Sequence, residues 1–236
     1  MSKAVPKPLG ILPLGDAAAY VEFAEELDLE VNEAVQRLAA ALRARALPWV
    51  RDVVPALGGV AIHFDPAHPE IPAAPLQTAA AAVEACLAEG LPAEEAVGRE
   101  LEVPACYDPE LALDLDAIAE RVKLSPEEVA RRHAACEYHV LMMGFAPGLP
   151  YLGGLDPKLA VPRRAEPRLV VPPGSIAIAN LQAVVYPYAI PGGWNVVART
   201  PLVPFDARRE PPSLFEPGDR IRFVPISRAE FERRSR

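Results

Sequence analysis

Four arginines in the C-terminal half of the chain are the residues best suited to bind an anion. They are Arg163, Arg164, Arg168 and Arg199, and the first three lie close together in the sequence. A guanidinium group offers paired N–H donors that match the geometry of a carboxylate or a phosphate. The competing interpretation is a charged surface in contact with solvent. The sequence therefore predicts a small-anion site, with solvent exposure as the alternative for each arginine.

Loops rich in glycine and proline surround these arginines. Gly148, Gly192 and Gly193 allow close approach of the backbone, so the N–H groups of their loops could contact a ligand. Tyr151 and Trp194 lie in the same turns, and amphipathic rings at such places often form the wall of a pocket or an interface. Tight corners of a barrel also need glycine and proline, and both rings could serve in corner packing. The residues alone leave both interpretations open.

A nucleophile or a metal site has weaker support. His133 and Cys136 would share one face of a predicted helix, so a thiolate–imidazole pair is geometrically conceivable, but a single cysteine on an apolar helix is usually inert core. His63, Asp65 and His68 fit no closed zinc pattern, and strand alternation would divide them between two faces. No phosphate-binding Walker loop or G-x-G-x-x-G segment is present. We expect no metal and assign no catalytic residue.

The composition sets the broad class. With 236 residues, 51% of them hydrophobic, the chain is long enough for two domains, and no apolar run could span a membrane or serve as a signal peptide. Three separated cysteines suit a reducing compartment, so we expect a cytoplasmic protein. The net charge of −8 argues against nucleic acid as a partner, although residues 125–236, with fifteen basic and eleven acidic side chains, could hold a small anion.

The first half of the chain alternates between strand and helix patterns. Strands are predicted at 18–23, 49–54 and 60–64, and the last two are joined by the Gly58-Gly59 turn. One helix is predicted to start at an Asn32 N-cap, and a second to cover about residues 75–89. This order predicts a two-layer α/β sandwich. The segment 91–95 is the expected linker, which gives domains 1–92 and 93–236. The strand-like residues 99–106 could complete the first domain or open the second.

The second half changes to short strands. Helices are predicted at 115–122 and 125–136, the second after the Ser125 capping box. Beyond them, turns of proline and glycine separate short β-rich segments, which are 138–145, 169–171, 175–179, 183–188, 194–199 and 220–224. Such spacing predicts a closed or nearly closed β-barrel.

Residues 138–201 also carry a series of motifs. They read GFAPGLPYLGGL from Gly144, PRR from Pro162, PR from Pro167, VPPGSIAIA from Val171, then PGGW and RTP. This series resembles the KipI / PxpB family, whose members are also called the B subunit of 5-oxoprolinase, allophanate hydrolase subunit 1 and carboxyltransferase subdomains C and D. The resemblance extends more weakly to the N-terminal half.

The resemblance implies an α+β fold, in which an N-terminal two-layer α/β sandwich is followed by a cyclophilin-like β-barrel domain. It implies a non-autonomous subunit of an ATP-dependent 5-oxoprolinase, with ATP as a cofactor of the complex and with KipA/PxpC-type and PxpA-type partners. One branch of the family instead inhibits autophosphorylation of a sensor histidine kinase, which is the first alternative. An allophanate hydrolase or carboxyltransferase-like subunit is the second.

The motif positions give a set of expected site residues. Substrate or partner binding is expected at His133, Phe145, Pro147, Gly148, Tyr151, Arg163, Arg164, Arg168, Ser175, Gln182, Gly192, Gly193, Trp194 and Arg199. The chain departs from the family at one place. Where relatives commonly have Gly-x-Gln-Thr-Gly, it has Asn180, Leu181, Gln182, Ala183 and Val184, which removes a hydroxyl and two glycines.

Overall fold

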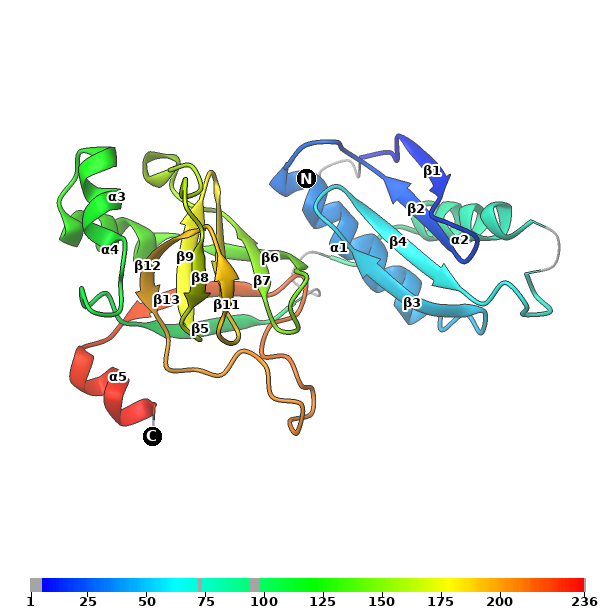
Figure 1. Cartoon of the computed structure of the whole chain (residues 1–236). Helices are drawn as coiled ribbons and strands as arrows, with labels where there is room; N and C mark the ends of the chain where they lie inside the picture. Colours follow the sequence, from blue (N-terminus) through cyan, green and yellow to red (C-terminus); the bar gives the residue numbers. More distant parts are fainter. Residues whose placement is uncertain (1–5, 72–73, 94–97, 236) are drawn as a thin grey trace. The chain divides into compact units, whose positions relative to one another are not determined.

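The chain forms two compact units, residues 1–98 and 99–236 (Figure 1). The computed structural model describes residues 6–71, 74–93 and 98–235. The domain boundary predicted after residue 92 lies a few residues before this division. Within the described residues, no helix has the length and apolar character needed to cross a membrane.

The N-terminal unit is a two-layer α/β sandwich, as the sequence predicts. Its antiparallel sheet has the order β1-β2-β4-β3, from Gly10–Pro13, Ala18–Glu22, Gly59–Phe64 and Val50–Pro55. Helices α1 (Leu29–Ala44) and α2 (Pro75–Glu89) share one apolar core with this sheet, to which they contribute Leu38 and Val83. Strand β1 was not predicted, because it is short and only half-buried.

The predicted N-cap of α1 is wrong. Asp28 is the N-cap, and its carboxylate accepts hydrogen bonds of 2.8 and 3.2 Å from two backbone N–H groups of the first turn. Asn32 lies inside the helix, and its amide donates to the carbonyls of Ala56 and Leu57 at 2.9 and 3.0 Å. The side chain therefore holds the turn between β3 and β4 to the helix, and it is not free to cap.

The C-terminal unit is built on a nearly closed seven-stranded barrel, as predicted. The strand order is β12-β9-β10-β7-β6-β13-β5, from Asn195–Arg199, Ser175–Ala179, Gln182–Val185, Pro150–Gly153, Tyr138–Met143, Arg220–Pro225 and Glu100–Ala105. The two edge strands meet where Cys106 and Arg199 exchange backbone hydrogen bonds of 2.8 and 2.9 Å. Strand β5 pairs in parallel with β13, so residues 99–106 open the second unit.

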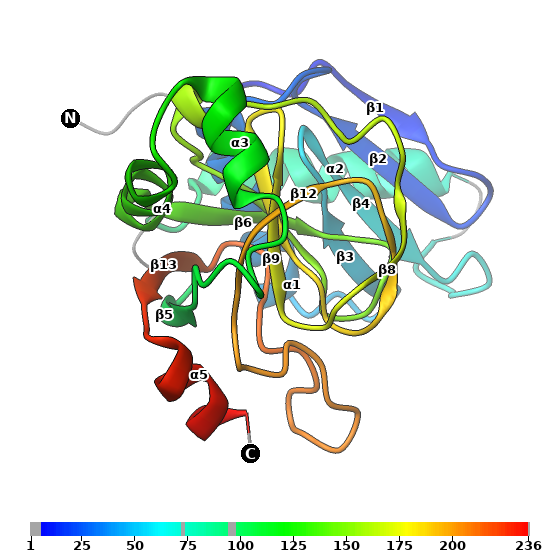
Figure 2. The ribbon, with the colours of Figure 1, turned by 60° about the vertical axis from the view of Figure 1, so that its left-hand side comes forward.

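The barrel is accompanied by α-helices, which Figure 2 shows, and by a short 3-10 helix, Pro157–Leu159. Helix α3 covers Leu115–Val122 and packs against α4, Pro126–Ala135, while α5 covers Arg228–Arg234. The predicted capping box is confirmed, because the Ser125 hydroxyl accepts from the N–H of Glu128 at 3.2 Å.

Strand β9 is buried on both faces because it serves two cores. Ile176 and Ile178 point into the barrel, whereas Ala177 and Ala179 face a second core. A two-stranded ribbon, β8 (Arg168–Val171) and β11 (Ile190–Gly192), covers this second core, to which it contributes Val171 and Ile190. The ribbon therefore leaves a groove above the outer face of the barrel sheet.

Candidate functional site

A groove of about 240 Å³ lies between the barrel sheet and the ribbon. Seven of the predicted site residues line it: Phe145, Tyr151, Arg163, Arg164, Gly192, Gly193 and Trp194. Leu149, Pro167, Val184, Tyr186 and Pro191 complete the lining. The wall is therefore mainly aromatic and apolar, with two cations and no carboxylate among the residues that line it.

Arg163 is the cation available for a ligand in this groove. Its guanidinium carbon lies 5.6 Å from the centre of the Trp194 ring, and Trp194 meets Tyr151 edge to face at 5.8 Å. The side chain of Arg163 is exposed and forms no ion pair with the described residues. A cation held over an aromatic face keeps its N–H edges free for an anion.

Arg164 and Arg168 are committed to one buried carboxylate. Arg164 Nη1 lies 2.5 Å from Asp114, and Arg168 binds the same group through two nitrogens at 2.7 and 2.8 Å. The backbone N–H of Val196 adds a bond of 2.7 Å, and Asp114 is 4% exposed. This hydrogen bonding by Asp114 raises the pKa of Arg168. The two arginines therefore anchor the ribbon, and their guanidinium groups are hydrogen-bonded within the protein.

Asp114 was not predicted as a site residue. It directly precedes α3, where an aspartate usually caps the helix, but its side chain makes no capping hydrogen bond. The carboxylate turns to Arg164 and Arg168 instead. Asp114 comes close to the PRR and PR motifs only in the folded chain. The residues around Asp114 in the sequence therefore do not predict that it contacts these motifs.

The two adjacent glycines of the groove differ in their surroundings. A Cβ at Gly192 would lie 2.3 Å from the hydroxyl of Tyr186, a ring that is 3% exposed. A Cβ at Gly193 would lie no closer than 3.6 Å to its nearest neighbour, Pro167, and the Gly193 carbonyl accepts from the N–H of Arg164 at 2.7 Å. Burial is the main cause that raises the pKa of Tyr186, which keeps its phenol protonated.

The loop before β7 forms one end of the groove. Phe145 is 79% exposed at its mouth, and Pro147 is also exposed but does not line it. Gly148 has a φ of +79°, and a Cβ there would fall 2.6 Å from Cβ of Phe205. Gly148 therefore has a structural role in this loop, in agreement with the alternative that glycines serve tight corners of the barrel.

Ser175 and Gln182 lie near the second core without lining the groove. They belong to β9 and β10 and share strand faces with Ala177 and Val184, which pack in that core. The Ser175 hydroxyl and the Gln182 side-chain nitrogen are buried and have no hydrogen-bond partner within the described part of the chain. Their role as binding residues stays a prediction.

His133 lies away from the groove. It is fully buried, its Nδ1 is 2.8 Å from the hydroxyl of Tyr107, and its ring stacks on Phe223 at 5.0 Å. Burial lowers the pKa of His133 to about 3, so the ring is neutral at neutral pH. The environment is that of a core residue, and the predicted contact with substrate or partner has no support from this placement.

Arg199 also lies outside the groove lining. Its Nε donates to the carbonyl of Pro173 at 2.8 Å, and its guanidinium lies 5.7 Å from the ring centre of Phe231 in α5. Burial, followed by the nearby charge of Arg228, lowers the pKa of Arg199. Arg199 thus links the closing point of the barrel to α5.

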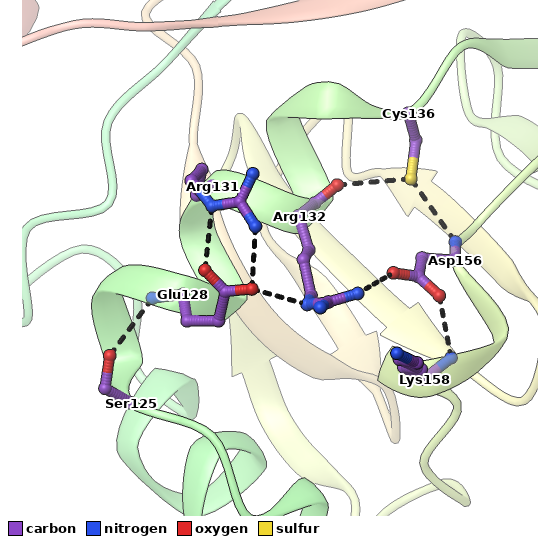
Figure 3. A network of polar contacts seen from close by, with 7 residues as sticks. All are labelled: Ser125, Glu128, Arg131, Arg132, Cys136, Asp156 and Lys158. Carbon is purple, nitrogen blue, oxygen red and sulfur yellow. Dashed lines mark hydrogen bonds and ion pairs between the residues drawn. The ribbon is translucent and has the colours of Figure 1, made fainter.

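Cys136 belongs to a separate polar network (Figure 3). Its thiol donates to the carbonyl of Arg132 and accepts from the N–H of Asp156, both at 3.3 Å. Arg132 bridges Glu128 at 2.7 Å and Asp156 at 2.9 Å. Cys136 follows the last residue of α4 and does not pair with His133, so the thiolate–imidazole pair is not formed. No group of three potential metal ligands occurs in the described residues.

Comparison with known proteins identifies the family. The model of the carboxyltransferase domain, subdomains C and D, matches residues 9–215. The chain belongs to this family. Among its relatives is the 5-oxoprolinase B subunit of Bacillus subtilis (strain 168), which is 38% identical over 92% of this chain and 93% of that protein. The protein of the same name from Escherichia coli O157:H7 is 37% identical over 90% of this chain and 94% of its own length.

A solved structure supports the fold assignment. The crystal structure of TTHA0988 matches with a TM-score of 0.75 and 35% identity over 89% of this chain. The match covers 40% of TTHA0988, so this chain corresponds to less than half of that protein. The carboxyltransferase-type fold and the family predicted from the motif series are thereby confirmed.

Proposed function

We propose that this chain is the B subunit of an ATP-dependent 5-oxoprolinase, in which its groove binds the substrate that a complex converts to glutamate. The observation that carries the proposal is the groove itself. It offers an unpaired guanidinium and aromatic walls, but no histidine, carboxylate, serine or cysteine lines it in the described part of the chain. Such a site can bind a small acid, and the phenols of Tyr151 and Tyr186 are the groups of its lining whose type can transfer a proton.

The names of the relatives support the same proposal. Two proteins similar over nine-tenths of this chain are named as the B subunit of 5-oxoprolinase, and a subunit works in a complex. We propose KipA/PxpC-type and PxpA-type proteins as the partners. ATP would be bound at the level of that complex, since this sequence has neither a Walker loop nor a G-x-G-x-x-G segment.

Exposed apolar side chains beside the groove suit a partner surface. Leu169 and Val170 on β8 are 86% and 61% exposed, and Phe145 at the groove mouth is 79% exposed. Large apolar side chains with this exposure are expected at protein–protein interfaces. We propose that the KipA/PxpC-type subunit covers them.

Reconstitution tests the function. The purified chain alone should form no glutamate from 5-oxoproline and ATP, whereas a mixture with KipA/PxpC-type and PxpA-type proteins should do so. Leu169→Asp should weaken co-purification with the KipA/PxpC-type subunit, and Leu12→Asp, at a 48% exposed position of β1, is the matched control. Full activity of the chain alone, or no activity of the complete mixture, would refute the proposal.

The two alternatives from the family resemblance stay predictions. Inhibition of a sensor histidine kinase would be measured as autophosphorylation with and without this chain. Allophanate hydrolysis, the carboxyltransferase-like alternative, would be measured as ammonia release in the same reconstituted mixtures.

A further inference from the structure

Two arginines line the groove, but one of them is already bound to a carboxylate of the protein. Arg164 is bound to Asp114, which also holds Arg168, so N–H donors of both arginines are engaged within the protein. Arg163 has no acidic partner in the described chain and points its guanidinium over Trp194. Arg163 is therefore the arginine of the groove lining whose guanidinium is not held by a carboxylate, and it lies next to a flat aromatic surface.

The dimensions and lining restrict the ligand. A volume of about 240 Å³ is below the range of about 300–1,000 Å³ that is usual for drug-sized ligands. The residues that line it come from strands and loops, so no helix N-terminus supplies the row of N–H donors that commonly binds phosphate. One planar guanidinium presents a pair of N–H donors, which matches the two oxygens of a carboxylate.

We infer that the groove is a carboxylate subsite that this chain forms without a partner, in which Arg163 binds the carboxylate and Trp194 and Tyr151 contact a small flat ring. The inference rests on the proposed function for its substrate, because 5-oxoproline combines one carboxylate with one compact ring. It goes further by assigning recognition of the acid to Arg163 and by separating that residue from its neighbours Arg164 and Arg168, which position the ribbon.

The two tryptophans of the chain provide an internal control. Trp194 lines the groove, whereas Trp49 is buried in the core of the N-terminal unit. Each gives one indole N–H signal in a ¹H–¹⁵N NMR spectrum, and Trp49→Phe assigns them. Titration of the isolated full chain with 5-oxoproline should shift the Trp194 signal and leave that of Trp49 in place. No shift of the Trp194 signal at millimolar ligand, or binding only after a partner is added, would overturn the inference.

Ligand variants test the carboxylate. The probe 2-pyrrolidinone keeps the ring of 5-oxoproline but lacks the acid, and it should bind at least about tenfold more weakly, because it cannot form the charge-assisted hydrogen bonds to Arg163. Inorganic phosphate is the second probe. If it shifts the Trp194 signal with equal or higher affinity, the assignment to a carboxylate is wrong.

Protein variants test Arg163. Arg163→Gln should weaken 5-oxoproline binding by about tenfold or more, with Arg163→Lys in between, because lysine keeps the charge but loses the paired donors. Arg233→Gln, at an exposed position of α5, is the matched control and should bind like the unmodified chain. Unchanged affinity of Arg163→Gln overturns the inference. An inactive reconstituted complex with intact binding would instead refute the proposed function alone.

Discussion

At the residue scale, Asp114 and His133 show two ways in which the protein meets the free-energy cost of burying an ionisable side chain. The buried carboxylate of Asp114 is compensated by contacts with two guanidinium groups and a backbone N–H. His133 has no such partner: its Nε2 is buried without a hydrogen bond, and its only ring-nitrogen contact among the described residues is the neutral hydroxyl of Tyr107. The protein therefore holds His133 in its uncharged form.

His133 should make folding stability depend on pH. The pKa of His133 is about 3 in the folded state, below the ordinary 6.5. Between pH 3 and pH 6.5 the unfolded chain therefore binds one more proton at this residue than the folded chain does. Above the pKa that His133 has in the unfolded chain, this group does not lower the free energy of unfolding. As the pH falls below that pKa, the free energy of unfolding decreases, by about 2 kcal/mol between pH 7 and pH 5. Urea unfolding at several pH values measures this. His133→Gln removes the titrating group, and an equally steep pH dependence in that variant would contradict the prediction.

The residue types of the site were predictable, but their partners were not. Arg163, Arg164 and Arg168 had equal weight as anion ligands, because nothing local in the sequence distinguishes them. The distinction comes from Asp114, which lies fifty residues before Arg164 and contacts it only in the folded chain. His133 was chosen from its match to a family motif, and its burial could not be deduced without the packing of aromatic rings around it.

At the element scale, the ribbon of β8 and β11 forms the groove by lying close to the barrel. Its contact depends on Gly192, which allows the backbone of β11 to reach the buried ring of Tyr186. The sequence predicted the longer strands well, but β7 and β11, with four and three residues, show too little alternation to be recognised. Both of these strands line the groove, β7 through Tyr151 and β11 through Gly192, so the prediction lacked a strand on each side of it.

Gly192→Ala should displace the ribbon. The added methyl group would lie 2.3 Å from the Tyr186 hydroxyl, and a buried ring cannot move away freely, so we expect a loss of about 1–3 kcal/mol in unfolding free energy. Gly193→Ala is the matched control and should stay within about 0.5 kcal/mol, because its nearest neighbour is 3.6 Å away. Tyr186→Phe removes the closest atom and should restore part of the loss. Equal effects of the two alanine variants, measured by urea unfolding, would contradict this packing.

At the scale of the whole molecule, each unit has its own hydrophobic core. The core of the N-terminal unit contains residues between Ala19 and Cys86, and the barrel core contains residues between Val103 and Phe223. The barrel begins with β5, which supplies Val103 and Ala105 to that core. The sequence predicted two domains, but β5 could not be assigned from its pattern, because its neighbour β13 lies near the other end of the barrel segment.

The position of β5 predicts where the chain can be divided. A fragment of residues 99–236 should fold with one cooperative thermal transition and dispersed NMR signals, because it keeps β5 and the ion pair of 2.6 Å between Arg99 and the buried Asp219. A fragment of residues 107–236 should not, since it loses the pairing of β5 with β13 and the two hydrogen bonds between Cys106 and Arg199 that close the barrel. The two fragments share every helix of the unit and all the groove residues, so their comparison isolates the closure. If the shorter fragment folded as well as the longer one, the barrel would not need its seventh strand, and the groove would depend only on the sheet from β12 to β13.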